Sequence, residues 1–150
     1  MFTGYYLSKI GWIQLCADEH DLLSCEFVEK NGIENRNHVI DETIKQLKEY
    51  FDGTRFVFDL PIRLLGTDFQ IKVWNALMKI PYGKTCSYQD IAYAINQPNA
   101  CRAVGNANNK NKIAIIIPCH RVIGKDKKMV GYASGVEKKE ALLALETLNC

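Results

Sequence analysis

The sequence of 150 residues lacks several features that define whole classes of protein. Its longest unbroken apolar run, from Ile113 to Ile117, is far shorter than the roughly 20 residues that a membrane-spanning helix needs. Its first residues lack the basic-then-apolar layout of a secretory signal peptide. With only 4 Pro and 10 Gly, the composition is neither collagenous nor typical of disorder. We therefore expect a folded, soluble, cytoplasmic protein that does not contact membranes.

Recognisable metal-ligand and disulfide patterns are missing as well, although the sequence contains 6 Cys and 3 His. No two cysteines have the CxxC spacing, and His20, His38 and His120 do not form a spaced ligand set with them. A chain of this length can bury a hydrophobic core without disulfides. The expected state is therefore reduced thiols and no zinc site.

Charge is distributed unevenly along the chain. The net charge is only +2, yet residues 1–65 carry a net −4 and residues 66–150 a net +6. This asymmetry is compatible with a second half that binds a polyanion such as nucleic acid, while the first half has a structural role. An excess of this size also occurs in domains that bind no nucleic acid, so charge alone leaves both interpretations open.

Residues 1–62 predict a small β-sheet covered by one helix. Short runs rich in aromatic and β-prone residues are separated by polar turns, and a later segment has apolar residues at helical spacing. The predicted elements are strands at 3–8, 11–17, 22–29 and 56–60 and a helix from Ile40 to Phe51. No catalytic constellation stands out in this part, so we expect a supporting domain.

Residues 63–150 predict a mainly helical domain. Thr67 and Gln70 have the spacing of a capping box, which marks the start of a helix. Ser87 can cap a second helix at 88–96, and a third is predicted at 99–108. Two helices joined by a tight turn form a helix-turn-helix outline. The expected fold class is therefore α+β, with a small sheet-plus-helix domain followed by a helical domain that contains a winged-helix-like helix-turn-helix.

The third predicted helix has an unusually bare surface. Ala103, Gly105 and Ala107 are small, and Arg102 is the long side chain of its first turns. Small residues allow a helix to approach the minor groove of DNA closely while one Arg reaches inward. The same residues equally suit close packing against a neighbouring helix, so the sequence leaves both possibilities open.

Cys119 and His120 are adjacent and follow the buried apolar run in the basic half. A thiolate is a good nucleophile, and a neighbouring base raises its population. Successive side chains of an extended segment point to opposite sides, so this pair needs a bend or a bridging water to communicate. The alternative is an inert buried Cys beside a structural His.

Residues 117–122, Ile-Pro-Cys-His-Arg-Val, reproduce the signature of the O6-alkylguanine-DNA alkyltransferases, which are direct-reversal DNA repair proteins. Residues 80–89 resemble the family's segment that leads into its helix-turn-helix, and 102–105 resemble its recognition helix. The C-terminal loop and last helix of the family are matched by Gly131, Tyr132, Gly135, Lys139 and 142–146. The resemblance covers residues 63–150; over 1–62 it rests only on length and on the strand-helix pattern.

The resemblance implies a role for each matching residue. Cys119 would accept the alkyl group, His120 would act through a water as the base, and Glu146 would orient His120. Asn111 matches a hinge, and Tyr88 matches the residue that helps to rotate the damaged nucleotide and meets the charge on the leaving guanine. The remaining implied DNA-binding residues are Arg102, Ala103, Gly105 and Arg121, and the implied pocket residues are Val122, Tyr132 and Ser134.

The function implied by the resemblance is irreversible transfer of an alkyl group from O6-alkylguanine in duplex DNA to Cys119, once per molecule and after base flipping. The implied partner is the minor groove of double-stranded DNA, bound by a monomer without cofactor or metal; O4-methylthymine is left open as a substrate. Lys112 follows Asn111 where many relatives have Pro. A non-catalytic binder of alkylated DNA is the main alternative, and a Cys-His hydrolase, which would turn over, is the third.

Overall fold

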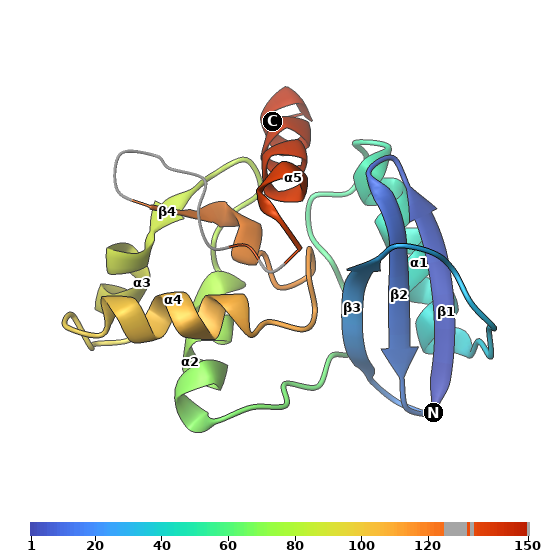
Figure 1. Ribbon diagram of the computed structural model, residues 1–150, viewed down its shortest axis with the longest axis horizontal. Coiled ribbons are helices and arrows are strands. Elements are labelled where there is room, and N and C mark those ends of the chain that lie inside the picture. The colour runs from blue at the N-terminus through green and yellow to red at the C-terminus, as the bar shows by residue number, and fades with distance from the viewer. Residues whose placement is uncertain (125–131, 133, 150) are drawn as a thin grey trace. The chain divides into compact units, whose positions relative to one another are not determined.

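The computed structural model describes residues 1–124, 132 and 134–149, so Gly131 and Cys150 lie outside the described residues. The chain divides into two compact units, Met1–Leu64 and Leu65–Cys150 (Figure 1). Each unit has its own secondary structure, and they are described in turn.

The first unit is built on a three-stranded antiparallel sheet in the order β1-β2-β3. The strands are β1 (Phe2–Ser8), β2 (Gly11–Ala17) and β3 (Leu22–Val28), which confirms the three predicted N-terminal strands to within a residue at each end. Along β2, Ile13, Leu15 and Ala17 are buried at alternate positions. This alternation gives the sheet one apolar face.

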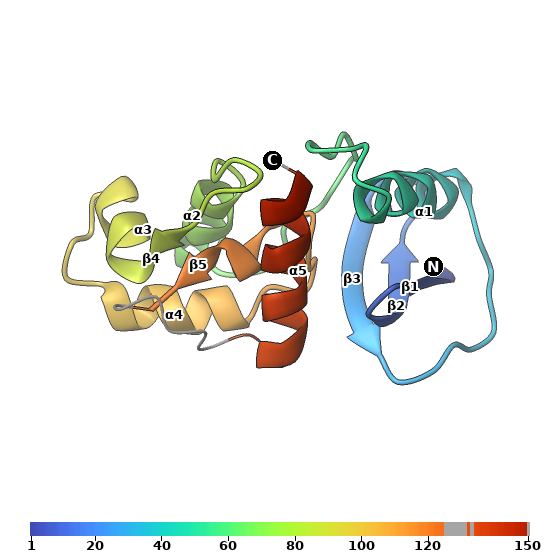
Figure 2. The ribbon, with the colours of Figure 1, turned by 90° about the horizontal axis from the view of Figure 1, so that it is seen from above.

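Helix α1 (His38–Phe51) covers that face of the sheet, as Figure 2 shows. Asn37 caps the helix by accepting a hydrogen bond from the Ile40 amide. Helix and sheet approach so closely that a Cβ at Gly4 would lie 2.4 Å from Ile40 Cγ2. The sheet-plus-helix prediction for this part of the chain is therefore confirmed.

The predicted strand at 56–60 is wrong, because this segment is irregular. Both backbone groups of Asp59 bind the Gln46 side chain of α1 rather than a neighbouring strand. The edge of β3 is used only farther along, in a bridge between Leu22 and Ile62. A β-prone sequence forms a strand only where a partner strand accepts its hydrogen bonds.

The second unit is mainly helical. Its elements are α2 (Asp68–Leu77), β4 (Cys86–Ser87), α3 (Tyr88–Ala94), α4 (Cys101–Asn109), the 3₁₀ helix η1 (Cys119–Arg121), β5 (Val122–Ile123) and α5 (Val136–Asn149). Strands β4 and β5 form a short parallel pair. Both predicted caps are confirmed, since Thr67 and Ser87 each begin a helix with a complete capping box.

Helices α3 and α4 form the predicted helix-turn-helix. Helix α3 ends two residues earlier than predicted because Asn96 adopts a left-handed conformation with φ 61°. Val104 and Ala107 of α4 are buried, and the Trp74 indole of α2 donates a hydrogen bond to the Ala107 carbonyl at 2.9 Å. The α+β fold class is thus confirmed. None of the helices in the described part of the chain has the length and apolar character needed to span a bilayer.

Candidate active site in the helical unit

Cys119 lies at the first position of η1 and is 4% exposed. The apolar run before it is not a strand: turns occupy 114–116, and Ile115 has a φ of 72°. A positive φ is unfavourable for a β-branched residue, and such strain often marks a functional segment. The turn of η1 supplies the bend that an extended Cys-His pair would have lacked.

Asn111 holds this turn around the thiol. Its Nδ2 group lies within hydrogen-bonding distance of the Ile117 carbonyl at 2.9 Å, the Ile113 carbonyl at 3.3 Å and Cys119 Sγ at 3.2 Å. Its Oδ1 accepts a hydrogen bond from the Ile113 amide at 2.9 Å. One side chain therefore connects the segment after α4 to the Cys119 turn, at the position that the family resemblance assigns to a hinge.

His120 and Glu146 form a fully buried pair. His120 Nε2 lies 2.6 Å from Glu146 Oε2, and the two side chains are 0% and 1% exposed. Within the described residues, His120 Nδ1 has no hydrogen-bond partner. A proton on Nε2, donated to the carboxylate, leaves Nδ1 with a lone pair that can accept a proton.

Arg121 does not fit its expected role in DNA binding. It is only 6% exposed, and its Nε and Nη2 donate to the two oxygens of Glu146 at 2.8 and 3.0 Å. Its Nη1 donates to the Ile80 carbonyl at 2.8 Å, and the guanidinium lies 5.6 Å from the Tyr82 ring centroid. A residue that the family resemblance assigned to DNA binding is instead the counter-charge of Glu146.

These environments change the ionisation of each group. Burial raises the pKa of the Cys119 thiol to about 11, against the opposing effects of the Asn111 hydrogen bond and the Lys139 charge. Burial on its own would raise the pKa of Glu146, but the His120 and Arg121 contacts outweigh it and lower the pKa to about 2. Burial also lowers the pKa of His120, although Glu146 acts in the opposite direction. The resting site therefore holds a neutral thiol, a neutral imidazole and a carboxylate.

Two tyrosines predicted for the site lie near the thiol. Tyr132 is buried, and its hydroxyl acts to lower the pKa of Cys119. Burial raises the pKa of Tyr88, and the nearby Cys119 and Cys101 sulfurs add to this effect. The Tyr88 phenol thus remains protonated at neutral pH and can serve as a proton donor.

The other expected pocket residues differ in their surroundings. Val122 is fully buried in β5, where its carbonyl accepts a hydrogen bond from the Lys139 ammonium. Ser134 is half-buried in a turn, and the described contacts do not bring it to the thiol. Reasoning from sequence did not assign a role to Lys139, whose complete burial is the signal that identifies it.

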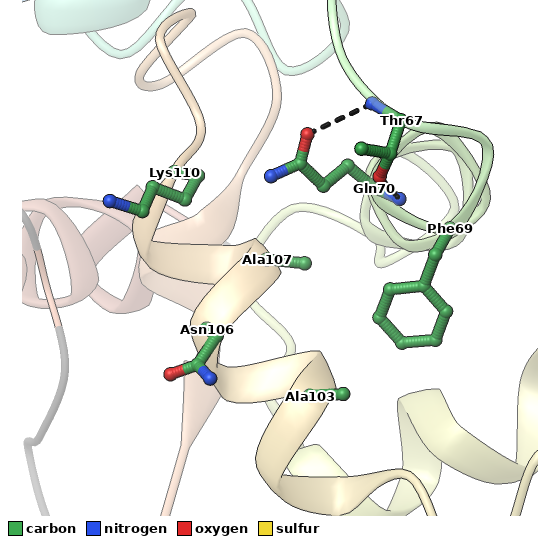
Figure 3. A pocket seen from close by; sticks show the side chains of 7 residues that line it. All are labelled: Thr67, Phe69, Gln70, Ala103, Asn106, Ala107 and Lys110. Carbon is green, nitrogen blue, oxygen red and sulfur yellow. Dashed lines mark hydrogen bonds between the residues drawn. The ribbon is translucent and has the colours of Figure 1, made fainter.

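The exposed face of α4 carries the remaining predicted DNA-binding residues. Arg102 and Ala103 are exposed, and a Cβ at Gly105 would lie 3.8 Å from the Tyr88 ring. Position 105 of α4 therefore lies in van der Waals range of the Tyr88 ring of α3, and a small side chain such as Ala would also fit there. Beside this face is an open pocket of about 230 Å³ between α4 and the start of α2, shown in Figure 3. Its lining residues are Thr67, Phe69, Gln70, Ala103, Asn106, Ala107 and Lys110.

Neither a disulfide nor a metal-binding cluster of side chains occurs within the described part of the chain. Cys16, Cys25, Cys86, Cys101 and Cys119 form no disulfide with one another. The described residues contain no group of three or more His, Cys, Asp or Glu side chains arranged to hold a metal ion.

Comparison with known proteins gives consistent matches over both units. Residues 1–64 match the family model "6-O-methylguanine DNA methyltransferase, ribonuclease-like domain", and residues 68–148 match the model of its DNA binding domain. A methylated-DNA–protein-cysteine methyltransferase of Methanosarcina barkeri is 49% identical over 99% of both chains.

Two solved structures from Mycobacterium tuberculosis are also similar. Its O6-methylguanine methyltransferase superposes with a TM-score of 0.91 at 41% identity, covering 100% of this chain and 95% of the other. A structure of the protein called OGT in complex with DNA superposes with a TM-score of 0.88 at 43% identity, covering 97% and 92% of the two chains.

Proposed function

We propose that this chain, which belongs to the 6-O-methylguanine DNA methyltransferase family, repairs alkylated DNA. It would do so by transferring the alkyl group of O6-alkylguanine to Cys119. The single observation that carries this assignment is the buried set of Cys119, His120 and Glu146, a thiol, a base and an orienting carboxylate. The half-buried Asn111 side chain lies against the thiol. The set follows the nucleophile–base–orienter logic of a hydrolytic triad, applied to a different reaction.

Thiolate formation is the first chemical step. With a thiol pKa of about 11, Cys119 is almost entirely protonated at neutral pH and needs a base. His120 Nδ1 takes the proton through a bridging water, while Glu146 keeps the other ring nitrogen protonated and stabilises the imidazolium that forms.

Alkyl transfer follows as an in-line displacement. Cys119 Sγ forms a bond to the alkyl carbon, the bond from that carbon to guanine O6 breaks, and the electron pair remains on guanine. The Tyr88 phenol meets this developing negative charge with a hydrogen bond or a proton. Atoms and electrons balance between thiolate and alkylguanine, so the reaction requires no cofactor.

The product limits each molecule to one reaction. A thioether at Cys119 is chemically inert, and the site offers no chemistry that would hydrolyse it. The enzyme is therefore consumed stoichiometrically with the lesions that it repairs.

DNA binding is assigned to the helix-turn-helix of α3 and α4. The small exposed residues of α4 suit close approach to a minor groove, and Arg102 can occupy the space that a flipped nucleotide leaves. The alkyl group on O6 lies inside the base stack, so Cys119 can reach it only after the nucleotide is extruded. Tyr132 and Val122, both buried beside Cys119, would line the pocket that receives the base. One chain supplies the whole site, which is consistent with action as a monomer.

Intact-protein mass spectrometry tests the proposal. After the full chain is mixed with a short duplex carrying one O6-methylguanine, we expect a gain of one methylene, mapped to Cys119, at no more than one event per molecule. Cys119→Ser should show no gain, whereas Cys86→Ser, which removes a half-buried thiol elsewhere in this unit, should react normally. Binding without any adduct would favour the non-catalytic binder, and repeated turnover without an adduct would favour a hydrolase.

A further inference from the structure

The carboxylate of Glu146 is shared between His120 and Arg121. Its Oε2 lies 2.6 Å from His120 Nε2 and also accepts a hydrogen bond from Arg121 Nη2 at 3.0 Å. Its Oε1 accepts a second hydrogen bond from Arg121 Nε at 2.8 Å. A two-pronged contact of this kind is the geometry in which a guanidinium pairs most strongly with a carboxylate. The oxygen that faces the imidazole is therefore also part of a buried ion pair.

Arg121 is held in place by contacts with a different part of the chain as well. Its Nη1 donates a hydrogen bond to the Ile80 carbonyl at 2.8 Å, and the guanidinium lies 5.6 Å from the centroid of the Tyr82 ring. The residue is only 6% exposed. The guanidinium cannot move away from Glu146 without giving up these contacts too, so its charge is fixed beside the carboxylate.

A carboxylate without a counter-charge would favour the protonated form of a neighbouring imidazole. A negative charge at hydrogen-bonding distance raises the pKa of a histidine, and the effect is largest where water is excluded. An imidazolium has no lone pair, so a protonated His120 could not accept the proton of Cys119. The Arg121 cation offsets the negative charge of Glu146, while the hydrogen bond that orients the ring remains in place.

We propose that Arg121 is a positioning residue for alkyl transfer: by pairing with Glu146, it keeps His120 neutral at physiological pH, so that the base is ready to accept the thiol proton. The inference deepens the proposed function and rests on it for the role of His120. Arg121 acts on the base through Glu146, whose own role is to orient the ring.

The ionisation of His120 agrees with this assignment. Burial lowers the pKa of His120, the contact with Glu146 raises it, and the charges of Arg121 and Lys139 lower it further. Glu146 would thus promote protonation of the ring if its charge were not balanced. Lys139 acts on His120 in the same direction as Arg121, and it is present unchanged in every variant compared below.

The other charged and titratable groups around η1 do not replace Arg121. Cys119 is a neutral thiol at neutral pH because its pKa is about 11. Helices α2 and α5 both pack against η1. Apart from Lys139, Glu146 and the half-buried Lys138, their charged side chains are exposed, namely Asp68, Lys72, Glu137 and Glu140. Exposed charges are screened by water and salt and act only weakly on a buried ring.

Two substitutions at position 121 separate the charge from the hydrogen bonds. Arg121→Gln keeps a hydrogen-bond donor and removes the charge, whereas Arg121→Lys keeps the charge without the planar fork. Lys79→Gln is the matched control, since it removes a positive charge from an exposed position next to Ile80. Near-ultraviolet circular dichroism establishes that each variant is folded.

Proton NMR titration of the His120 ring is the first measurement. The chain has 3 His, and His20 and His38 are exposed, so replacing both by Gln leaves His120 as the one imidazole observed. We expect a His120 midpoint below the ordinary 6.5 in this background. The midpoint should rise by about one pH unit or more in Arg121→Gln, but not in Arg121→Lys or Lys79→Gln.

This titration needs no DNA, so its result is independent of whether the chain repairs alkylguanine. An unchanged His120 midpoint in folded Arg121→Gln would overturn the proposal. A midpoint above neutral pH in the background with Arg121 intact would also overturn it, and that result can be obtained even if Arg121→Gln does not fold.

Single-turnover alkyl transfer as a function of pH is the second measurement. If His120 must be neutral to react, the pH at which the rate reaches half of its plateau should rise in Arg121→Gln by the shift seen in the NMR titration, and Arg121→Lys should restore it. A purely structural role of Arg121 would instead lower the rate by the same factor at every pH, and that result would overturn the proposal.

Discussion

Replacing Glu146 by Gln tests whether the buried charge network stabilises the helical unit as well as the reaction. The carboxylate accepts hydrogen bonds from Arg121 Nε at 2.8 Å and Nη2 at 3.0 Å and from His120 Nε2 at 2.6 Å. A Gln side chain has nearly the same shape but only one acceptor oxygen, and its amide group would face a donor. The substitution therefore leaves the Arg121 cation buried without its counter-charge.

The size of the effect follows from two separate considerations. The pKa of Glu146 falls from its ordinary 4.5 to about 2, and since one pKa unit corresponds to about 1.4 kcal/mol, its ionised form contributes about 3 kcal/mol to the free energy of unfolding at neutral pH. Removing one partner of a buried ion pair typically costs about 3–5 kcal/mol. We expect Glu146→Gln to lose about 3–5 kcal/mol at neutral pH.

The loss should depend on pH in a defined direction. Because the pKa of Glu146 is lowered in the folded state, its contribution is fully present above the ordinary value of 4.5 and is lost as the pH falls towards about 2. The stability difference between the wild-type chain and Glu146→Gln should therefore be largest near neutral pH and should shrink through the acid range.

Urea denaturation of both proteins over this pH range measures the difference. Glu140→Gln is the control, because Glu140 is exposed on the same helix, and its loss should be within about 0.5 kcal/mol of zero. A loss in Glu146→Gln as small as that of the control, or a difference that stays constant as the pH falls, would refute the reasoning.

Two further predictions concern the hinge and the DNA-facing helix. Asn111→Ala removes the hydrogen bonds to Cys119 Sγ and its turn, so we expect at least a tenfold slower single-turnover transfer and a loss of about 1–3 kcal/mol in urea denaturation; transfer as fast as in the exposed-site control Asn109→Ala would contradict this. Arg102→Ala should weaken binding to a lesion duplex by about tenfold or more without changing the melting temperature, whereas unchanged affinity in a binding titration would exclude Arg102 as a DNA contact.

Local features of the fold were predictable from the sequence because they depend on residues a few positions apart. The β-prone and aromatic residues of 3–8, 11–17 and 22–29 and the helical spacing of Ile40 to Phe51 each mark an element in the local sequence. The capping boxes that begin at Thr67 and Ser87 each mark a helix start with a motif of only four consecutive residues. The segment 56–60 has the composition of a strand but lacks a partner, and composition carries no information about partners.

The residue types that carry the chemistry were recognisable from the order Ile-Pro-Cys-His-Arg-Val and its companion motifs, because such motifs are local in the chain. The surroundings of each residue depend on how distant segments pack and could not be predicted in this way. Glu146 meets His120 across 26 positions of the chain, and Arg121 turns inward to the same carboxylate instead of outward to DNA. Lys139 becomes a buried cation because α5 packs against η1 and β5. Burial and long-range charge pairing arise from packing between distant segments, and these set the pKa values on which the reaction depends.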